Sequence, residues 1–464
     1  MNVLVTGGTG FIGKALVRRL IEAGHRVTVL SRDPQRAAKS LPVRCRTAGW
    51  TSSRELDPQV LAGADAVIHL AGEGVADRRW NEARKRAIHD SRVLGTRTLV
   101  KALAKLPSSQ RPATLLSASA IGVYGDRGDE ILDETSAPGS GFLAEVCRDW
   151  EDEIFAAREL GLRTVAVRIG IVLGNGGGAL QQMLPLFRLG VGGRVGSGNQ
   201  WMSWIHLDDL VGLFEYALTH EQVSGTLNGT APRPVTNADF TADLARAVQR
   251  PALIPVPAVA LQLALGEMST IVLASQRVLP RGTEQSGFQF RHPLLAPALA
   301  TICADDFEVL EREQWLPQPI EAVFPFFADA RNLEQITPPF LHFEVQKVEP
   351  REVRDGTLID YRLRLHGFPV SWQSRIEEFV PGLKFVDTQT RGPYSLWHHT
   401  HEFEEYEGGT IVRDRVRYRL PLAPLGNLVA GSFVNRDLEQ IFDYRRQKME
   451  ELFPVSSPKR AAND

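Results

Sequence analysis

Short apolar runs alternate with amphipathic stretches along the first 250 residues of the chain. Residues 14–23, 79–106 and 142–160 place their apolar positions at helical spacing. The apolar runs between them indicate strands. Strands that alternate with helices predict a parallel, doubly wound α/β sheet, which binds ligands at the carboxyl ends of its strands. The expected strands span residues 2–6, 26–30, 65–70, 112–119 and 163–169.

The hydrophobic pattern changes near residue 305. Residues 360–365 and 412–420 alternate apolar and charged positions, which predicts a curved antiparallel sheet that is wet on one face. A pair of glycines at 408–409 marks the turn between the last two expected strands. The expected helices of this part span residues 320–327, 333–337 and 433–453.

Composition and charge exclude several classes of protein. The chain has 464 residues, 43% hydrophobic and 23% charged, which is ordinary for a soluble protein of two or three domains. Its net charge of −2 gives no general attraction to nucleic acid, so we expect no such partner. Three scattered cysteines, Cys45, Cys147 and Cys303, indicate reduced thiols in the cytoplasm. The most apolar segment, residues 252–265, is interrupted by prolines and is shorter than the ~20 residues of a membrane helix, so we expect no integral membrane segment.

A glycine-rich turn follows the first expected strand. Gly7, Gly10 and Gly13 stand between that strand and a helical pattern that opens at Phe11. Glycine lets the backbone turn with positive φ and lets a pyrophosphate approach the peptide plane. The free N–H groups and the positive end of the helix then face the anion. This order of strand, turn and helix predicts a phosphate-binding turn, and a turn without a ligand is the alternative.

The end of the second expected strand indicates which dinucleotide binds. A carboxylate about 20 residues after the glycines would bind the adenosine ribose hydroxyls of NAD. Here the strand ends in Ser31 and Arg32, and a guanidinium suits a 2′-phosphate. We therefore predict NADP(H). Asp33 is a competing carboxylate one residue later, and a solvated surface side chain is the alternative for Arg32.

Several motifs of the first 300 residues resemble those of the extended short-chain dehydrogenase/reductase superfamily. They are GGTGFIG at residues 7–13, HLAG at 69–72, SASAIGVYG at 117–125 and WIHLDDL at 204–210. Within that superfamily the chain resembles one atypical, nucleotide-sugar epimerase-like branch. The branch markers are AGEGVADRRWNEARK at 71–85, SR at 91–92, RIGIVLGNGGGAL at 168–180, GSGNQWMSWIH at 196–206 and VLPRGTEQSGFQF at 278–290.

The resemblance implies a Rossmann-type fold with a substrate region at about residues 176–299 and a short tail module. The implied cofactor-binding residues are Gly7, Thr9, Gly10, Phe11, Ile12, Gly13, Ser31, Arg32, Leu70, Ala71, Gly72, Glu73, Arg92 and Ile171. The implied substrate pocket includes Tyr124, Phe142 and Trp204, although core packing also explains Trp204. Glycine-dense loops at residues 176–178 and 190–198 either close over a ligand or are plain turns.

The usual proton donor of the superfamily is missing. Its members use a Tyr-x-x-x-Lys pair after the GVYG motif, in which the lysine lowers the pKa of the tyrosine. This chain has Phe142 and Val146 at those positions, and phenylalanine has no proton to give. Ser119 matches the active-site serine, so we assign it the catalytic role of orienting a substrate; a turn or cap residue is the alternative. Glu73 and Lys85 are other titratable candidates.

The second half resembles the START-like helix-grip fold of the polyketide cyclase/dehydrase and lipid-transport superfamily. Residues 307–345 carry the signature, and antiparallel strands and a long helix follow. In this α+β fold the sheet wraps the last helix around an apolar cavity, which implies an apolar ligand; a filled core is the alternative. The aromatic residues expected to line such a cavity are Phe340, Phe343, Tyr361, Phe368, Trp372 and Trp397.

A histidine-rich strand near residue 400 raises the question of a metal. His399 and His401 share one face of the expected strand, and His398 points away. Metal sites usually need three or four convergent ligands, and no carboxylate–histidine pattern appears on a helix. We therefore expect a polar strand face and no metal site.

Two functions fit the sequence. The first is an NADP(H)-dependent oxidoreductase or epimerase-like enzyme acting on a small-molecule substrate. The second is a non-catalytic NADP(H)-binding protein whose helix-grip part binds a hydrophobic ligand or partner. Phe142 and Val146 favour the second, and the fusion of two modules mildly favours the first. The expected domains span residues 1–245, 246–300 and 305–455, with a disordered tail at 456–464. The sequence indicates neither the substrate nor the oligomeric state.

Overall fold

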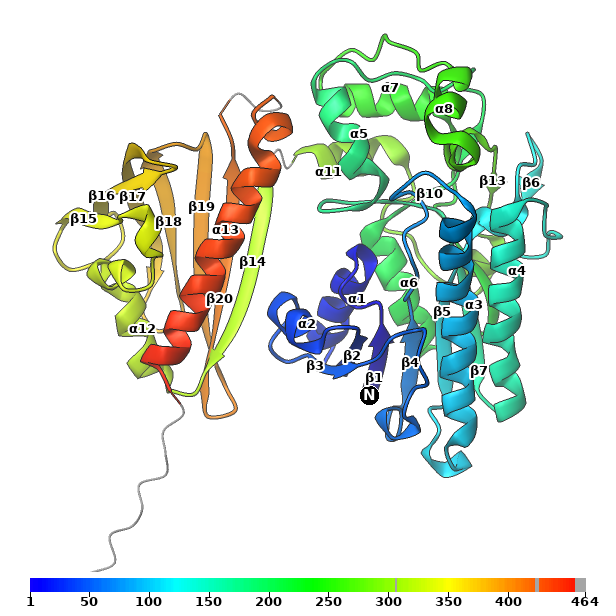
Figure 1. Ribbon diagram of the computed structural model, residues 1–464, viewed down its shortest axis with the longest axis horizontal. Coiled ribbons are helices and arrows are strands. Elements are labelled where there is room, and N and C mark those ends of the chain that lie inside the picture. The colour runs from blue at the N-terminus through cyan, green and yellow to red at the C-terminus, as the bar shows by residue number, and fades with distance from the viewer. Residues whose placement is uncertain (305–306, 422–424, 455–464) are drawn as a thin grey trace, which may run out of the picture. The chain divides into compact units, whose positions relative to one another are not determined.

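The computed structural model describes residues 1–304, 307–421 and 425–454. The tail expected at residues 456–464 lies outside these ranges. The chain divides into two compact units, Met1–Asp305 and Asp306–Asp464, which are shown in Figure 1. Each unit is described by itself.

A seven-stranded parallel sheet forms the centre of the first unit. Its strands are β1 (Asn2–Thr6), β2 (Arg26–Ser31), β3 (Arg46–Gly49), β4 (Ala66–His69), β5 (Thr114–Ala120), β7 (Arg163–Ile169) and β11 (Gly225–Gly229). Their order is β11-β7-β5-β4-β1-β2-β3. The strand order reverses between β1 and β4, which is where ligands bind in such sheets. The predicted doubly wound sheet is confirmed.

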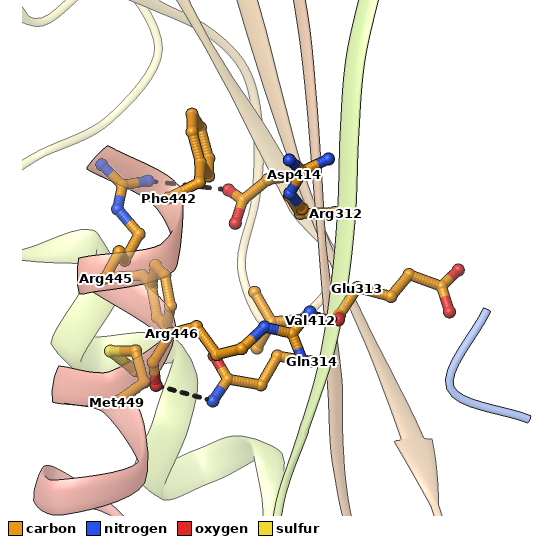
Figure 2. A pocket seen from close by; sticks show the side chains of 10 residues that line it. Arg312, Glu313, Gln314, Val412, Asp414, Phe442, Arg445, Arg446 and Met449 are labelled. Carbon is orange, nitrogen blue, oxygen red and sulfur yellow. Dashed lines mark hydrogen bonds and ion pairs between the residues drawn. The ribbon is translucent and has the colours of Figure 1, made fainter. Parts of the chain in front are cut away.

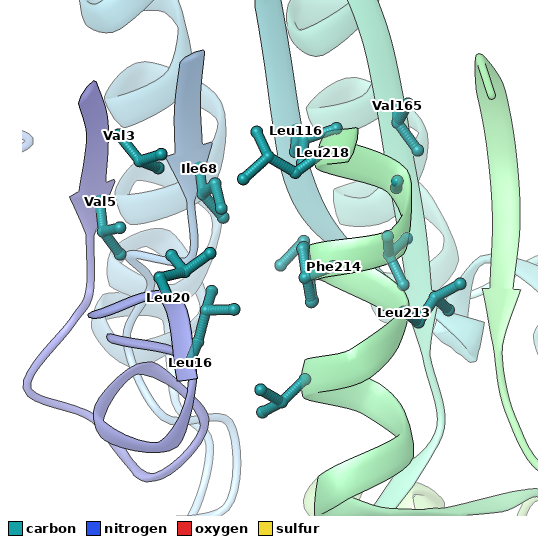
Figure 3. Packing of buried hydrophobic residues seen from close by; sticks show 14 of the residues in the cluster. Val3, Val5, Leu16, Leu20, Ile68, Leu116, Val165, Leu213, Phe214 and Leu218 are labelled. Atoms are coloured by element: carbon teal, nitrogen blue, oxygen red, sulfur yellow. The ribbon is translucent and has the colours of Figure 1, made fainter. Parts of the chain in front are cut away.

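Helices cover both faces of this sheet. They are α1 (Phe11–Glu22), α2 (Pro34–Ser40), α3 (Glu82–Lys105), α4 (Phe142–Phe155) and α6 (Leu207–Thr219). Because neighbouring strand residues point to opposite faces, β1 contributes to two cores. Val3 and Val5 join the cluster that includes α1 and α6 (Figure 3), whereas Leu4 packs with the α3 residues Leu99 and Leu103.

The rest of the first unit forms a smaller lobe beyond the carboxyl ends of the strands (Figure 1). Its strand pairs are β8 (Ile171–Leu173) with β10 (Trp204–His206), β9 (Trp201–Met202) with β12 (Val235–Thr236), and β6 (Ile131–Leu132) with β13 (Arg277–Val278). Its helices are α5 (Gly178–Arg188), α7 (Asn237–Ala247), α8 (Ala258–Leu265), α9 (Thr270–Leu273), α10 (Arg281–Gln285) and α11 (Leu295–Ala304). A buried cluster that includes Phe187, Phe240 and Leu299 holds the lobe together.

The second unit is an antiparallel sheet with a long helix lying along it (Figure 1). The strands are β14 (Glu308–Leu316), β15 (Glu344–Glu349), β16 (Leu358–Leu365), β17 (Phe368–Val380), β18 (Lys384–Arg391), β19 (Leu396–Tyr406) and β20 (Gly409–Arg419), and the helices are α12 (Ile320–Ala328) and α13 (Leu425–Leu452). The strand order is β14-β20-β19-β18-β17-β16-β15. Phe324 of α12 and Met449 of α13 share one core with Phe385 and Phe403 of the sheet. The expected helix-grip fold is confirmed.

Candidate functional site

The glycine turn packs tightly between the end of β1 and the start of α1. Gly7 has a φ of 71°, and a Cβ there would lie 2.7 Å from the Leu70 carbonyl carbon. A Cβ on Gly13 would overlap the Gly7 carbonyl oxygen. At Gly10, by contrast, an added Cβ would meet only that carbonyl oxygen, at 3.4 Å. The turn is therefore closed toward the protein at Gly7 and Gly13 and open at Gly10.

The first turn of α1 has no acidic side chain and no side-chain cap. The backbone amides of Phe11, Ile12 and Gly13 lie in this first turn, so they have no hydrogen-bond acceptor within the helix. Thr9, in the turn itself, is exposed. A helix start of this kind can accept a phosphate group.

A buried polar pair fixes the ends of β1 and β4 beside this turn. Thr6 Oγ1 lies 2.7 Å from His69 Nδ1 and accepts a hydrogen bond from the Ala71 amide at 3.2 Å. Burial lowers the pKa of His69 to about 4, so the imidazole is neutral at neutral pH. The pair holds residues 70–71 against the glycine turn.

The end of β2 presents a mostly exposed arginine and a carboxylate that caps a helix. The Arg32 side chain is 80% exposed and lies 3.6 Å from Glu73 Oε1. Asp33 instead caps α2, because its Oδ1 accepts the Arg36 amide at 2.9 Å. The Ser31 hydroxyl, 3.2 Å from the Asp33 amide, completes this turn. The carboxylate that competed with Arg32 in the sequence is engaged in helix capping.

The segment after β4 lies over a buried arginine. Arg92 Nη1 donates to the carbonyl oxygens of Glu73 at 3.0 Å and Ile88 at 3.2 Å. A Cβ on Gly72 would lie 3.2 Å from the Arg92 guanidinium carbon, so the two are in close contact. Burial lowers the pKa of this arginine, but a guanidinium remains charged at neutral pH. Arg92 therefore holds the segment after β4 in place, through its hydrogen bond to Glu73 and its contact with Gly72.

One glycine-dense loop packs on Phe11. A Cβ on Gly177 would lie 2.5 Å from the Phe11 ring, and one on Gly174 would lie 3.3 Å from it. Ile171, in β8 just before this loop, is half-buried. The second loop, residues 190–198, is bound instead to residues 254–258, where Val195 bridges Val256. The structure therefore brings only the first loop to the glycine turn.

Ser119 belongs to a buried network that the sequence analysis did not identify. Its hydroxyl donates to Glu151 Oε1 at 2.6 Å. Arg168 donates two hydrogen bonds of 2.8 Å to the same carboxylate and one of 2.9 Å to the Tyr124 hydroxyl. That hydroxyl in turn donates to Asn228 Oδ1 at 2.8 Å. The signal in the sequence was Arg168, a charged residue between the apolar residues Val167 and Ile169 of an expected strand, which has to find a buried partner.

The positions expected to form a substrate pocket are mostly filled. Tyr124 and Trp204 are fully buried, and Trp204 Nε1 donates to the Arg233 carbonyl at 3.1 Å. Trp204 therefore packs in the core of the smaller lobe. Of the two alternatives that the sequence left open for it, core packing and a pocket wall, the structure favours core packing. Burial raises the pKa of Tyr124, which keeps its proton. Phe142 remains half-buried.

Phe142 sits in an aromatic and charged corner. Its ring meets Trp80 edge-on at 5.2 Å between centroids, and Lys85 Nζ lies 5.3 Å from the ring centre. Lys85 also pairs with Glu267 of the smaller lobe, and that bond raises the pKa of the lysine. Val146, where the superfamily has lysine, is buried. A cation thus stands beside the position of the missing phenol, although from another helix.

The interior of the second unit differs from the expected aromatic cavity. Phe340 and Phe368 are exposed on the surface, so they do not line the interior. Tyr361 is buried, Phe343 packs against it at 5.2 Å, and Trp372 meets Trp397 edge-on at 5.1 Å. These four aromatic rings pack against one another in two pairs.

A small polar cavity lies between α13 and strands β14 and β20 (Figure 2). Its volume of about 20 Å³ suits about one water molecule. Gln314, Asp414, Phe442, Arg445 and Met449 are among its lining residues. The cavity as folded is therefore too small for an apolar ligand of ordinary size.

Comparisons with known proteins match three parts of the chain. Residues 3–228 match the NAD dependent epimerase/dehydratase family, residues 256–302 match a domain of unknown function (DUF1731), and residues 316–443 match the polyketide cyclase / dehydrase and lipid transport family. Among the described residues, no helix combines the length and the apolar character needed to cross a membrane.

Relatives from bacteria, plants and animals resemble the first unit. The epimerase family protein Mb2239 of Mycobacterium bovis is 42% identical over 299 residues, which is 64% of this chain and 96% of that protein. A chloroplastic homolog of epimerase family protein SDR39U1 from Arabidopsis thaliana is 40% identical over 302 residues, 65% of this chain and 86% of its own. The crystal structure of human SDR39U1 (isoform 2) with NADPH is 38% identical with a TM-score of 0.59, and covers 66% of this chain and all of its own.

Proposed function

Because the chain belongs to the NAD dependent epimerase/dehydratase family, we propose that its first unit binds NADPH and exchanges a hydride with a small-molecule substrate. Both resemblances drawn from the motifs, to the short-chain dehydrogenase/reductases and to the helix-grip proteins, are confirmed by the family matches. We propose that residues 1–245 form the cofactor-binding domain, residues 246–300 its tail module and residues 305–455 the helix-grip domain.

The different engagement of Arg32 and Asp33 carries the choice of cofactor. Arg32 is mostly exposed and only loosely paired, so its guanidinium is available to a 2′-phosphate. Asp33 already caps α2 through Oδ1, which leaves fewer of its acceptor sites for ribose hydroxyls. The crystal structure of human SDR39U1 contains NADPH, which supports the same choice.

The glycine turn is the proposed binding site of the pyrophosphate. The space at Gly10 admits an anion close to the backbone, and the amides of Phe11, Ile12 and Gly13 point to it. Leu70, Ala71, Gly72 and Glu73 run along the adjacent strand end, and Arg92 supports them. The loop over Phe11 would close the far side, and Ile171 lies in the strand that leads into this loop.

Bound NADPH would supply the hydride, and the chain must supply the proton. We assign the orientation of the substrate to Ser119. Its hydroxyl donates a hydrogen bond to Glu151 in this structure. Lys85 is the proposed proton-bearing group, because it places an ammonium beside Phe142, where the superfamily has its tyrosine. Tyr124 and Phe142 then shape the wall of the site. Replacement of Lys85 with Met should abolish turnover, whereas Lys105→Met on the same helix should not.

Calorimetry of the purified full-length protein tests the cofactor assignment. We expect NADPH to bind at least about tenfold more tightly than NADH, because each charge-assisted bond to phosphate contributes about 1.5–3 kcal/mol. Equal affinities for NADPH and NADH would show that Arg32 does not select the cofactor. If neither dinucleotide bound, the proposed cofactor site would be wrong. Turnover is then sought with carbonyl compounds and nucleotide sugars by following the nicotinamide absorbance.

A non-catalytic role is the second candidate. Phe142 and Val146 replace the usual pair, and the Ser119 hydroxyl is held by a buried carboxylate. Under this alternative, NADPH raises the melting temperature of the protein and no substrate is turned over. The helix-grip unit is then the functional partner, and it binds a small ligand after side chains move to enlarge the interior. We place the protein in the cytoplasm, since Cys45, Cys147 and Cys303 form no disulfide in the described part of the chain.

A further inference from the structure

Two histidines and two aspartates meet inside the helix-grip unit. His399 and His401 are two residues apart in β19, so their side chains leave the same face of the sheet. The strand register places Asp387 of β18 opposite His399, and Asp414 of β20 opposite His401. Strands on both sides thus bring a carboxylate to the histidine pair.

This cluster is buried. Only 4% of the His399 side chain and 5% of the His401 side chain are exposed, and their ring centroids are 3.9 Å apart. Two carboxylates in such surroundings need positive charge nearby, because an unpaired buried charge is costly. Arg445 of α13 supplies one such charge, with Nη1 3.8 Å from Asp414 Oδ1 (Figure 2).

The two carboxylates contact the histidines at different distances. Asp414 Oδ1 lies 2.9 Å from His399 Nε2 and 2.8 Å from His401 Nδ1, although the second contact is poorly directed for a hydrogen bond. Asp387 Oδ2 lies 3.2 Å from His399 Nδ1 and 3.4 Å from His401 Nε2. A tetrahedral ion with bonds of about 2.0–2.1 Å holds neighbouring ligand atoms about 3.4 Å apart. The Asp387 side therefore has the spacing of metal ligands.

We infer that Asp387, His399 and His401 bind a divalent transition-metal ion, with Zn²⁺ as the first candidate. Their ligand atoms lie within 4.8 Å of one another. Imidazole and carboxylate ligands suit Zn²⁺ and Co²⁺ alike. Each histidine binds the ion through the nitrogen that faces Asp387 and turns its other nitrogen to Asp414. A metal-bound imidazole usually has such a carboxylate partner.

Three protein ligands leave a fourth position for water or for an oxygen atom of a ligand. This distinguishes the cluster from a closed structural site with four protein ligands. The helix-grip unit would then recognise its small molecule through the metal ion, which needs less apolar volume than the cavity expected from the sequence.

A second group of ligating side chains in the first unit is the natural competitor. His206, Asp208 and His292 also have ligand atoms within 4.8 Å of one another. Asp208 is 60% exposed and lies 3.8 and 3.9 Å from the two histidines. The buried carboxylate beside this pair, Asp209, accepts from the backbone amides of Arg291 and His292, whereas Asp414 contacts the imidazole of His399.

Metal titration of the chelator-treated full-length protein tests the inference. We expect Zn²⁺ to bind by calorimetry, and Co²⁺ to give the visible absorption of a tetrahedral site. Asp387→Asn and His401→Gln should each abolish binding. Asp414→Asn should weaken it about 10–100-fold, because it acts through the histidines. His398→Gln, on the opposite face of β19, is the matched control and should bind normally.

Three results would overturn the inference. One is absence of binding by the unsubstituted protein, which would leave the cluster as a buried network of hydrogen bonds and ion pairs. Another is unchanged binding in both ligand variants, and the third is loss of binding in His206→Gln alone. X-ray absorption of the zinc-loaded, unsubstituted protein gives an answer even if a variant fails to fold, since two imidazole ligands are expected. NADPH affinity is measured in parallel and should not change, so this test is independent of the proposed function.

Discussion

Ser119 donates a hydrogen bond of 2.6 Å to Glu151, a carboxylate that two nitrogens of Arg168 hold from the other side. The residue that matches the active-site serine is therefore hydrogen-bonded to a buried ion pair. Both partners of that pair are less than 10% exposed. Any effect of a substitution at Ser119 must be separated into an effect on stability and an effect on turnover.

We predict that Glu151→Gln destabilises the first unit by about 3–5 kcal/mol, because it leaves the Arg168 guanidinium buried without a counter-charge. Ser119→Ala should cost only about 1–2 kcal/mol. Denaturant unfolding followed by circular dichroism measures both. Glu153→Gln on the same helix is the control, since its pair with Arg97 is partly exposed and should be worth about 1 kcal/mol or less. Equal losses for Glu151→Gln and Glu153→Gln would contradict the structural role.

The second prediction concerns cofactor choice. Arg32→Gln should weaken NADPH about 10–100-fold and leave NADH nearly unchanged, because only the 2′-phosphate is lost as a partner. Arg26→Gln removes the same charge from the opposite end of β2, and its affinities should match those of the parent protein. Parallel losses of both cofactors in Arg32→Gln would show that the arginine does not read the phosphate.

Gly10 and Gly13 should respond differently to alanine. At Gly10 the backbone has a φ of −76° and an added methyl group meets only the Gly7 carbonyl, so Gly10→Ala should fold normally. It should still weaken NADPH at least about tenfold, because the methyl group occupies the approach of the pyrophosphate. Gly13→Ala should destabilise the fold itself, since its methyl group overlaps the turn. Melting curves with and without NADPH distinguish the two, and unimpaired binding by a folded Gly10→Ala protein would refute the proposed phosphate site.

The buried His69 predicts acid sensitivity of the strand ends at the site. Its pKa is about 4 in the folded protein and about 6.5 when unfolded, so between these values only the unfolded chain takes up the proton. Stability is therefore complete above about pH 6.5 and falls as the pH falls toward 4, by about 2 kcal/mol at pH 5. Amide hydrogen exchange in β1 and β4, corrected for intrinsic rates, measures the change. His69→Asn should flatten this dependence, and an unchanged slope in that variant would assign the sensitivity to other groups.

Local sequence determined the elements and the glycine turn. Apolar runs, helical spacing and the three glycines act over short distances, so the order strand, turn, helix could be predicted and the doubly wound sheet follows from it. The position of Arg32 after β2 was predictable for the same reason. The missing tyrosine is likewise a local fact, visible at Phe142.

Tertiary structure decided which side chains meet across the sheets. Glu151 and Arg168 are 17 residues apart. The register of β5 with β7 places Arg168 beside Ser119, and the packing of α4 on these two strands brings Glu151 to both. The histidines of β19 looked like one polar face because their carboxylate partners stand on two other strands, and strand register is not written in any single segment. The volume left inside the helix-grip unit depends on how neighbouring aromatic rings interlock, which no periodicity records.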